Sequence, residues 1–285
     1  MRLLALTTLT MIAFAANSVL NRLGVGGGLI DPIGFALVRL LAGAATLAAL
    51  WAMRSRRYAV SGTILLQPAR RALGAASLLV YLFGFSLAYG VLDAGAGALI
   101  LFGWVQITMF AGAVLARERV PARRWAGAAL AFAGLLVLLA PGGGTPLGWH
   151  AAAMALAGIG WGVYSLAGRG ERDALAATAA NFIVAAPFGL ALALVLPGAV
   201  GLSLSGVALA IASGALASGL GYALWYSLLP QLGAARAAVA QLSVPLIAAA
   251  GGAALIGEAV SWRFGAAAAL VLGGVALAVM PGSRR

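Results

Sequence analysis

Aromatic side chains stand deep inside several long apolar stretches of this chain. Trp161 and Tyr164 lie three residues apart, so both fall on one face of a helix, as do Tyr222 and Tyr226 at a spacing of four. Rings at such depth predict a cavity for apolar or aromatic compounds, one that could also hold an ammonium group by cation–π attraction. The alternative is a belt of rings at the membrane interface. The candidate ring residues are Tyr81, Phe85, Tyr89, Trp104, Trp161, Tyr164, Tyr222 and Tyr226.

Three polar side chains join this candidate set, because polar groups within hydrocarbon usually face a bundle interior or a cavity. Asn17 and Gln241 could each bind substrate or hydrogen-bond a neighbouring helix. Gln241 precedes Pro245, and a proline inside a helix frees a backbone carbonyl that could line a cavity. Arg39 lies about 10 Å along its helix from Pro32. It could bind a carboxylate, extend to the outer headgroups or pair with a carbonyl.

The acidic residues, in contrast, fall at the ends of apolar stretches or between them. They are Asp31, Asp93, Glu118, Glu171, Asp173 and Glu258. Carriers coupled to protons or sodium commonly place an acid at mid-membrane, and none is expected there. Coupling therefore uses other groups, or the protein facilitates downhill export. His150, the one histidine, is expected to be a surface group.

Composition excludes several classes of protein. The 285 residues are 64 % hydrophobic and 8 % charged, whereas soluble domains carry about a quarter charged residues. The chain has no cysteine, which excludes disulfides and thiolate metal sites. It has no lysine, so a Walker A loop for ATP and a Schiff base to a carbonyl cofactor are excluded. No G-x-S-G or H-E-x-x-H motif is present, and no paired mid-membrane aspartates, so we expect neither an enzyme nor a cofactor.

Ten apolar runs, bounded by charge, Pro or Gly, predict an all-α integral membrane protein with ten transmembrane helices. The predicted segments are 3–21, 33–53, 72–92, 94–116, 124–140, 147–168, 175–197, 204–229, 234–256 and 262–281.

The distribution of arginine predicts the orientation, because Arg-rich short loops stay cytoplasmic. With the N-terminus inside, fifteen of the 18 arginines fall on the cytoplasmic side. Arg22 and Arg263 fall outside, and Arg39 lies within the second segment. Both termini are therefore predicted to be cytoplasmic. The net charge of +12 then reflects topology and contact with anionic lipid headgroups of the bilayer, not nucleic-acid binding.

An internal repeat emerges when the chain is compared with itself at an offset of 140 residues. The offset aligns Glu118-Arg119-Val120 with Glu258-Ala259-Val260, and Pro141-Gly142 with Pro281-Gly282. With a drifting offset, the first five segments match the last five. Because five is odd, the second copy must enter the membrane from the opposite side. The sequence thus predicts two inverted five-helix repeats, residues 1–142 and 143–285, as in many secondary transporters.

This plan, with the Glu-Arg-Val and Glu-Ala-Val starts before a Gly-rich last helix and the two Pro-Gly ends, resembles the EamA branch of the drug/metabolite transporter superfamily. Within that branch the chain is most similar to exporters of aromatic amino acids. The resemblance implies a bacterial inner-membrane exporter of amino acids or other small metabolites. Alternating access around a central aromatic cavity is the expected mechanism. A non-saturating channel or a lipid-translocating scaffold is the alternative.

Overall fold

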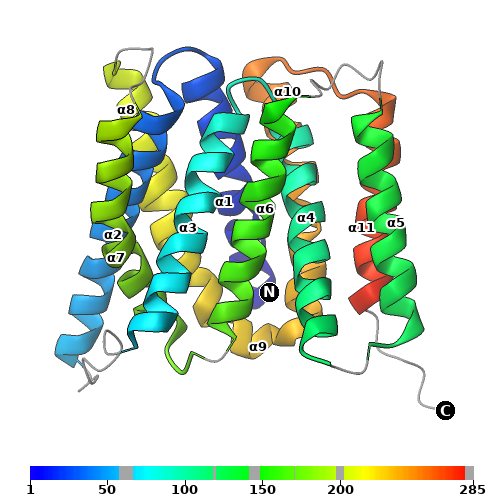
Figure 1. The fold of residues 1–285 in the computed structure, drawn as a ribbon, viewed down its shortest axis with the longest axis horizontal. Coiled ribbons are helices and arrows are strands. Elements are labelled where there is room, and N and C mark those ends of the chain that lie inside the picture. Colours follow the sequence, from blue (N-terminus) through cyan, green and yellow to red (C-terminus); the bar gives the residue numbers. More distant parts are fainter. Residues whose placement is uncertain (58–66, 118–119, 141–147, 170, 197–201, 280–285) are drawn as a thin grey trace.

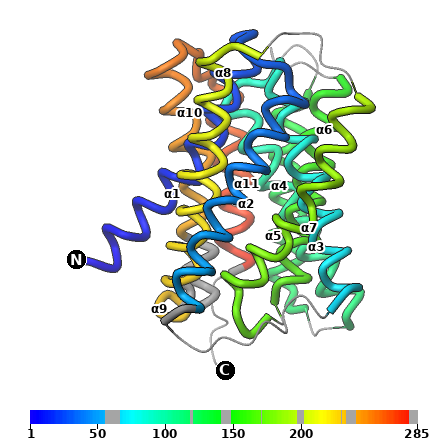
Figure 2. Tube along the Cα trace, turned by 90° about the vertical axis from the view of Figure 1, so that its left-hand side faces the viewer, coloured from blue at the N-terminus to red at the C-terminus, as the bar shows by residue number. Residues whose placement is uncertain are grey.

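The computed structural model describes residues 1–57, 67–117, 120–140, 148–169, 171–196 and 202–279, and all regular structure in these ranges is helical (Figure 1). The helices pack side by side in one bundle, and Figure 2 shows that the start of α1 projects from it. The elements are α1 (Arg2–Asn21), η1 (Arg22–Gly26), α2 (Pro32–Arg57), α3 (Pro68–Ala88), α4 (Ala94–Leu115), α5 (Ala122–Leu139), α6 (Trp149–Gly168), α7 (Ala174–Val195), α8 (Leu204–Ile211), η3 (Ala212–Leu220), α9 (Gly221–Gln241), α10 (Ser243–Ile256) and α11 (Trp262–Val279).

Among the described residues, eight helices are long and apolar enough to cross a membrane. The eighth of these spans, Leu204–Leu232, combines α8, η3 and most of α9. Two further apolar helices, Ser243–Ile256 and Trp262–Ala278, are shorter than the eight. The chain is therefore a multi-pass helical membrane protein, and the count of ten spans stays a prediction.

The predicted break between the eighth and ninth segments, at 229–234, is wrong. Helix α9 continues through Pro230 to Gln241, although a proline has no N–H to bond the carbonyl one turn earlier. The stretch that follows, 233–241, is rich in alanine, the strongest helix former, which favours continuation. The chain turns at Leu242 instead, and α10 begins at Ser243.

This turn also corrects the predicted role of Pro245. Gln241 is the last residue of α9, and Pro245 is the third residue of α10. The N–H groups of a first helical turn have no intrahelical acceptor, so a proline there breaks no helical hydrogen bond. The turn, rather than Pro245, ends the α9 ladder beside Gln241.

Glycines allow α5 and α11 to lie in close contact. A Cβ atom at Gly127 would meet the carbonyl oxygen of Gly274 at 2.4 Å, and one at Gly274 would meet that of Gly127 at 2.5 Å. Small residues let helix backbones approach in lipid, where hydrophobicity does not drive association. These two helices are equivalent in the predicted repeat.

The other helix contacts occur in matching pairs, in which a helix of one predicted repeat packs against a helix of the other. Helix α3 packs against α6 and α7. The continuous helix formed by η3 and α9 packs against α1, and its η3 part also packs against α2. Helix α4 packs against α6, and α10 packs against α1. Such exchange of neighbours agrees with two equivalent halves, and the inverted repeat divided at 142 and 143 stays a prediction. The repeat residues 118–119, 141–142 and 281–282 lie outside the described residues.

Candidate functional site

A cavity of about 720 Å³ occupies the half of the bundle where α3, α5 and α7 begin and where α4, α6 and α9 end, the lower half in Figure 1. Arg70, Arg124 and Arg169 stand at its rim and are exposed. The cavity therefore opens at the end of the bundle that carries the arginine clusters, and we call this opening the mouth.

Stacked rings form the deep wall of the cavity. The ring of Trp161 on α6 stacks on Tyr164 and on Tyr222, each with centroids 5.3 Å apart and with planes at 15° and 27°. The ring centroid of Tyr81, on α3, lies 4.9 Å from that of Trp161. Tyr226 and Gln241 line the same cavity. Such a wall offers flat, polarisable surfaces to apolar or aromatic groups.

A smaller pocket of about 20 Å³ lies beyond this wall, deeper in the bundle. It shares Trp161, Tyr222 and Gln241 with the large cavity, so the two spaces are neighbours. The remaining lining residues are Phe14, Asn17, Ser18, Tyr81, Phe85, Leu101 and Phe102.

Arg39 lies behind the small pocket and is fully buried. Its Nη2 donates to the Tyr81 hydroxyl at 2.8 Å, and its Nε donates to Ser218 Oγ at 3.3 Å. Ser218 and Ser213 in turn donate to the side-chain oxygen of Asn17. The predicted alternative that Arg39 extends to the outer headgroups is wrong, because this network holds it inside the bundle.

Ion pairs join helices at the mouth. Arg71 of α3 pairs with Glu171 and also donates to the side-chain oxygen of Asn181 at 3.0 Å. Arg54 of α2 pairs with Asp173, whose other carboxylate oxygen caps α7 by accepting from an N–H in its first turn. Arg71, Glu171 and Asn181 line the cavity, so its wall changes from apolar to charged towards the mouth.

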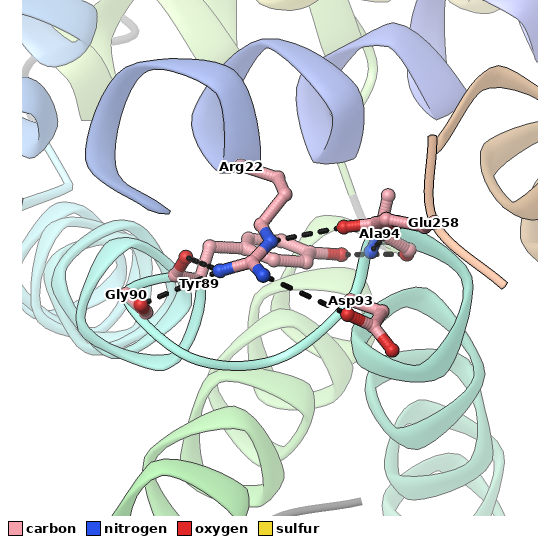
Figure 3. Close-up of polar contacts among 6 residues, drawn as sticks. All are labelled: Arg22, Tyr89, Gly90, Asp93, Ala94 and Glu258. Atoms are coloured by element: carbon pink, nitrogen blue, oxygen red, sulfur yellow. Dashed lines mark hydrogen bonds and ion pairs between the residues drawn. The ribbon is translucent and has the colours of Figure 1, made fainter. Parts of the chain in front are cut away.

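At the opposite end of the bundle, Arg22 joins three segments (Figure 3). Its Nε donates to Glu258 Oε1 at 2.9 Å, and its Nη2 lies 3.6 Å from Asp93 Oδ1. Its Nη1 donates to the carbonyl oxygens of Tyr89 and Gly90, both at 3.4 Å. We call Arg22, Asp93 and Glu258 the clamp. It ties the end of α1 to the α3–α4 and α10–α11 connections.

Backbone features position the clamp. Gly257 has a φ of +78°, the left-handed conformation that ends α10 and directs Glu258 back along the helix. Glu258 Oε2 then accepts from the N–H of Ala94 at 2.8 Å, where the helix dipole of α4 favours a negative charge. A Cβ at Gly252 would lie 2.3 Å from that Oε2. Arg22 begins the π-helical turn η1, a feature frequent at functional sites.

Tyr89 belongs to this closed end and lines neither cavity. Its hydroxyl donates to the carbonyl oxygen of Ala94 at 3.2 Å. Burial raises the pKa of Tyr89, so the hydroxyl stays protonated and keeps this hydrogen bond. Tyr89 therefore contributes to the packing of the closed end of the bundle.

The structure thus divides the predicted site residues into three groups. Trp161, Tyr164, Tyr222, Tyr226 and Gln241 line the large cavity, and Asn17, Tyr81 and Phe85 line the small pocket. Arg39 supports the small pocket from behind. Tyr89 and Trp104 lie outside both linings. The Cβ of Trp104 faces Gly158 of α6.

Sequence reasoning missed the clamp and the ion pairs at the mouth. One signal was available: Arg22 is one of only two arginines on the side predicted to be external, where Asp93 and Glu258 also fall. Isolated charges of opposite sign on a poorly charged face are candidates for pairing. In the described part of the chain, no three His, Asp or Glu side chains gather as metal ligands.

These features define a multi-pass membrane protein with an aromatic cavity that is open at one end and closed at the other. Residues 148–280 match the EamA-like transporter family. An uncharacterized protein of Pseudomonas aeruginosa is 47 % identical over 281 residues, which cover 98 % of this chain and 95 % of that protein. A crystal structure with 23 % identity shares the fold, with a TM-score of 0.66 over 95 % of this chain and 96 % of its own.

The second half of the chain therefore belongs to the EamA-like transporter family. Members of this family are transporters rather than enzymes, and in bacteria they reside in the inner membrane.

Proposed function

We propose that this protein exports small metabolites, aromatic amino acids among them, by alternating access. The observation that carries the proposal is a cavity of about 720 Å³ with a stacked aromatic wall, open at one end and closed by the clamp at the other. A continuous channel would be open at both ends, so this arrangement favours a carrier over a pore. Membership of a transporter family agrees with it.

The substrate class rests on the aromatic wall and on resemblance. Within the EamA branch, the sequence resembles the aromatic amino-acid exporter YddG, and this proposal draws on that resemblance. The side chain of phenylalanine or tyrosine is flat and apolar, and would stack on Trp161 and Tyr222. The rest of the amino acid would face the polar groups around them.

The direction of transport follows from the predicted orientation. If the arginine-rich end is cytoplasmic, the mouth faces the cytoplasm and the clamp faces outward. Substrate would enter from the cytoplasm and leave after the clamp opens and the mouth closes. No described carboxylate lines the deep part of the cavity, which favours facilitated export or coupling through other groups.

Counterflow in proteoliposomes tests this function. Vesicles preloaded with unlabelled phenylalanine should accumulate labelled phenylalanine transiently, and the initial rate should saturate with concentration. The same vesicles with alanine test the aromatic preference, and an imposed pH gradient tests proton coupling. Rapid flux without saturation or counterflow would instead indicate a channel, and would refute alternating access.

A further inference from the structure

Arg39 is a buried cation without a carboxylate partner among the described residues. The described acids are all engaged elsewhere: Asp93 and Glu258 in the clamp, Glu171 and Asp173 at the mouth, and Asp31 with the N–H of Gly34. Burying an unpaired guanidinium within a membrane bundle is costly. Its Nη1 is buried and makes no hydrogen bond. The chain itself therefore leaves the Arg39 charge uncompensated.

The charged guanidinium of Arg39 lies against two aromatic rings that line the small pocket. The Arg39 guanidinium carbon lies 5.2 Å from the centroid of the Tyr81 ring and 4.8 Å from that of Phe85. The Tyr81 oxygen accepts from Arg39, which leaves the Tyr81 proton for another acceptor. A hydroxyl polarised by a cation is a stronger donor than a neutral one. The small pocket is thus lined by a donor with positive charge behind it.

The size and place of the pocket fit a small anionic group. A cavity needs about 10–15 Å³ to hold one water, and this pocket offers about 20 Å³. That space accepts one carboxylate oxygen in place of a water, with the rest of the group reaching into the adjoining large cavity. Trp161 and Tyr222 line both the pocket and the large cavity, so a molecule with its carboxylate in the pocket could place its side chain against the rings.

We propose that the small pocket is the carboxylate subsite of the transporter. The substrate carboxylate accepts the Tyr81 O–H, and Arg39 is a positioning residue that polarises Tyr81 and balances the negative charge. This inference deepens the proposed function, on which it rests for the nature of the cargo. It assigns the cargo to organic acids and amino acids rather than to amines.

Two series of probes test the subsite, an aromatic series of phenylalanine, phenylpropionate and phenylethylamine and an aliphatic series of leucine, isocaproate and isoamylamine. Within each series the hydrocarbon is similar, and the carboxylate is absent from the amine. Binding is measured on the whole protein in detergent by intrinsic tryptophan fluorescence. We expect the carboxylate-bearing probes to bind about tenfold or more tightly than the amine.

Tyr81→Phe removes one hydroxyl and keeps the ring, so the fold should persist. It should reduce the ratio of acid to amine affinity to about one. Arg39→Gln should do the same, while Arg39→Lys retains part of the ratio because it keeps the charge. Tyr89→Phe is the matched control, since it also removes one buried tyrosine hydroxyl but Tyr89 lines neither cavity, and it should leave the ratio unchanged.

The outcomes separate the subsite from the proposed function. An acid preference that appears only in the aliphatic series would refute aromatic cargo while supporting the subsite. Equal affinity for acids and amines in both series would overturn the subsite, even if phenylalanine binds and is transported. A preference that survives Tyr81→Phe would also overturn it, and would leave Arg39 as a connector between helices.

Discussion

Removing Arg22 should open the closed end of the bundle. Arg22→Gln keeps a polar side chain but deletes the charge that holds Glu258 and Asp93. The end of α1 then loses its ties to the α3–α4 and α10–α11 connections. We expect the protein to sample the state in which the cavity opens at the clamp end more often.

The size of the effect follows from burial. The side chains of Arg22 and Glu258 are 20 % and 10 % exposed. Exposed ion pairs contribute about 0.2–1 kcal/mol, and truncating one partner of a buried pair costs about 3–5 kcal/mol. This mostly buried pair at a solvent-facing end lies between these limits, at about 2 kcal/mol. If the whole of this free energy stabilises the state closed at the clamp, Arg22→Gln raises the ratio of open to closed states by about thirtyfold.

Cysteine labelling measures this ratio without background, because the chain has no cysteine. Ser18 is buried in the small pocket on the clamp side of the aromatic wall. Ser18→Cys in oriented membrane vesicles is treated with an impermeant maleimide from the clamp side. The labelling rate should rise by about thirtyfold when Arg22→Gln is added.

Arg263→Gln is the control, since Arg263 lies at the same end and donates to the carbonyl of Ala140. It should leave the labelling rate of Ser18→Cys unchanged. If Arg22→Gln labels no faster than this control while remaining monodisperse, the clamp does not determine closure. If labelling rises equally from both sides of the membrane, the substitution has loosened the whole bundle and the argument fails.

Three further predictions concern the cavity, the bundle and the orientation. Trp161→Ala should weaken transport of phenylalanine several-fold and of alanine little, because stacking contributes about 0.5–1.5 kcal/mol beyond burial. The control is Trp149→Ala, which changes an exposed tryptophan of the same helix and should affect transport of neither substrate. Equal losses for phenylalanine and alanine in Trp161→Ala would contradict the aromatic site. Gly127→Ala should destabilise the protein by about 1–3 kcal/mol in thermal unfolding, because its Cβ meets the α11 backbone. Gly265→Ala, where a Cβ has open space, should be nearly neutral, and the reverse order would refute the packing argument. Reporter fusions that are active only outside the cytoplasm should be inactive at both termini, and activity at either one would overturn the predicted orientation.

Much of the fold could be predicted from local sequence because helices in lipid need long apolar runs. The predicted segment 94–116 corresponds to α4, Ala94–Leu115, and the predicted segment 33–53 lies within α2, Pro32–Arg57. The error at 229–234 arose because Pro230 and Gly233 indicate a break locally. The helix continues there because one lost hydrogen bond is offset by the alanines that follow.

The candidate site could be predicted only in part. The spacing of Trp161 with Tyr164 and of Tyr222 with Tyr226 placed each pair on one face, and all four rings line the cavity. Helical spacing does not say which face of an apolar helix meets a cavity and which meets another helix. Trp104 was therefore indistinguishable from the lining residues, although it packs towards Gly158.

The sequence by itself determined the class of the protein, since 64 % hydrophobic and 8 % charged residues exclude a soluble fold, and its predicted repeat and motifs resembled those of a transporter family. Only the tertiary structure decided which end is closed. The bond between Arg22 and Glu258 joins residues 236 positions apart, and no local pattern encodes a contact of that range. Likewise Arg39 became a support for Tyr81 because α2 and α3 are neighbours in the bundle. Charge and hydropathy act locally along the chain, whereas the pairing of charges depends on how the helices pack.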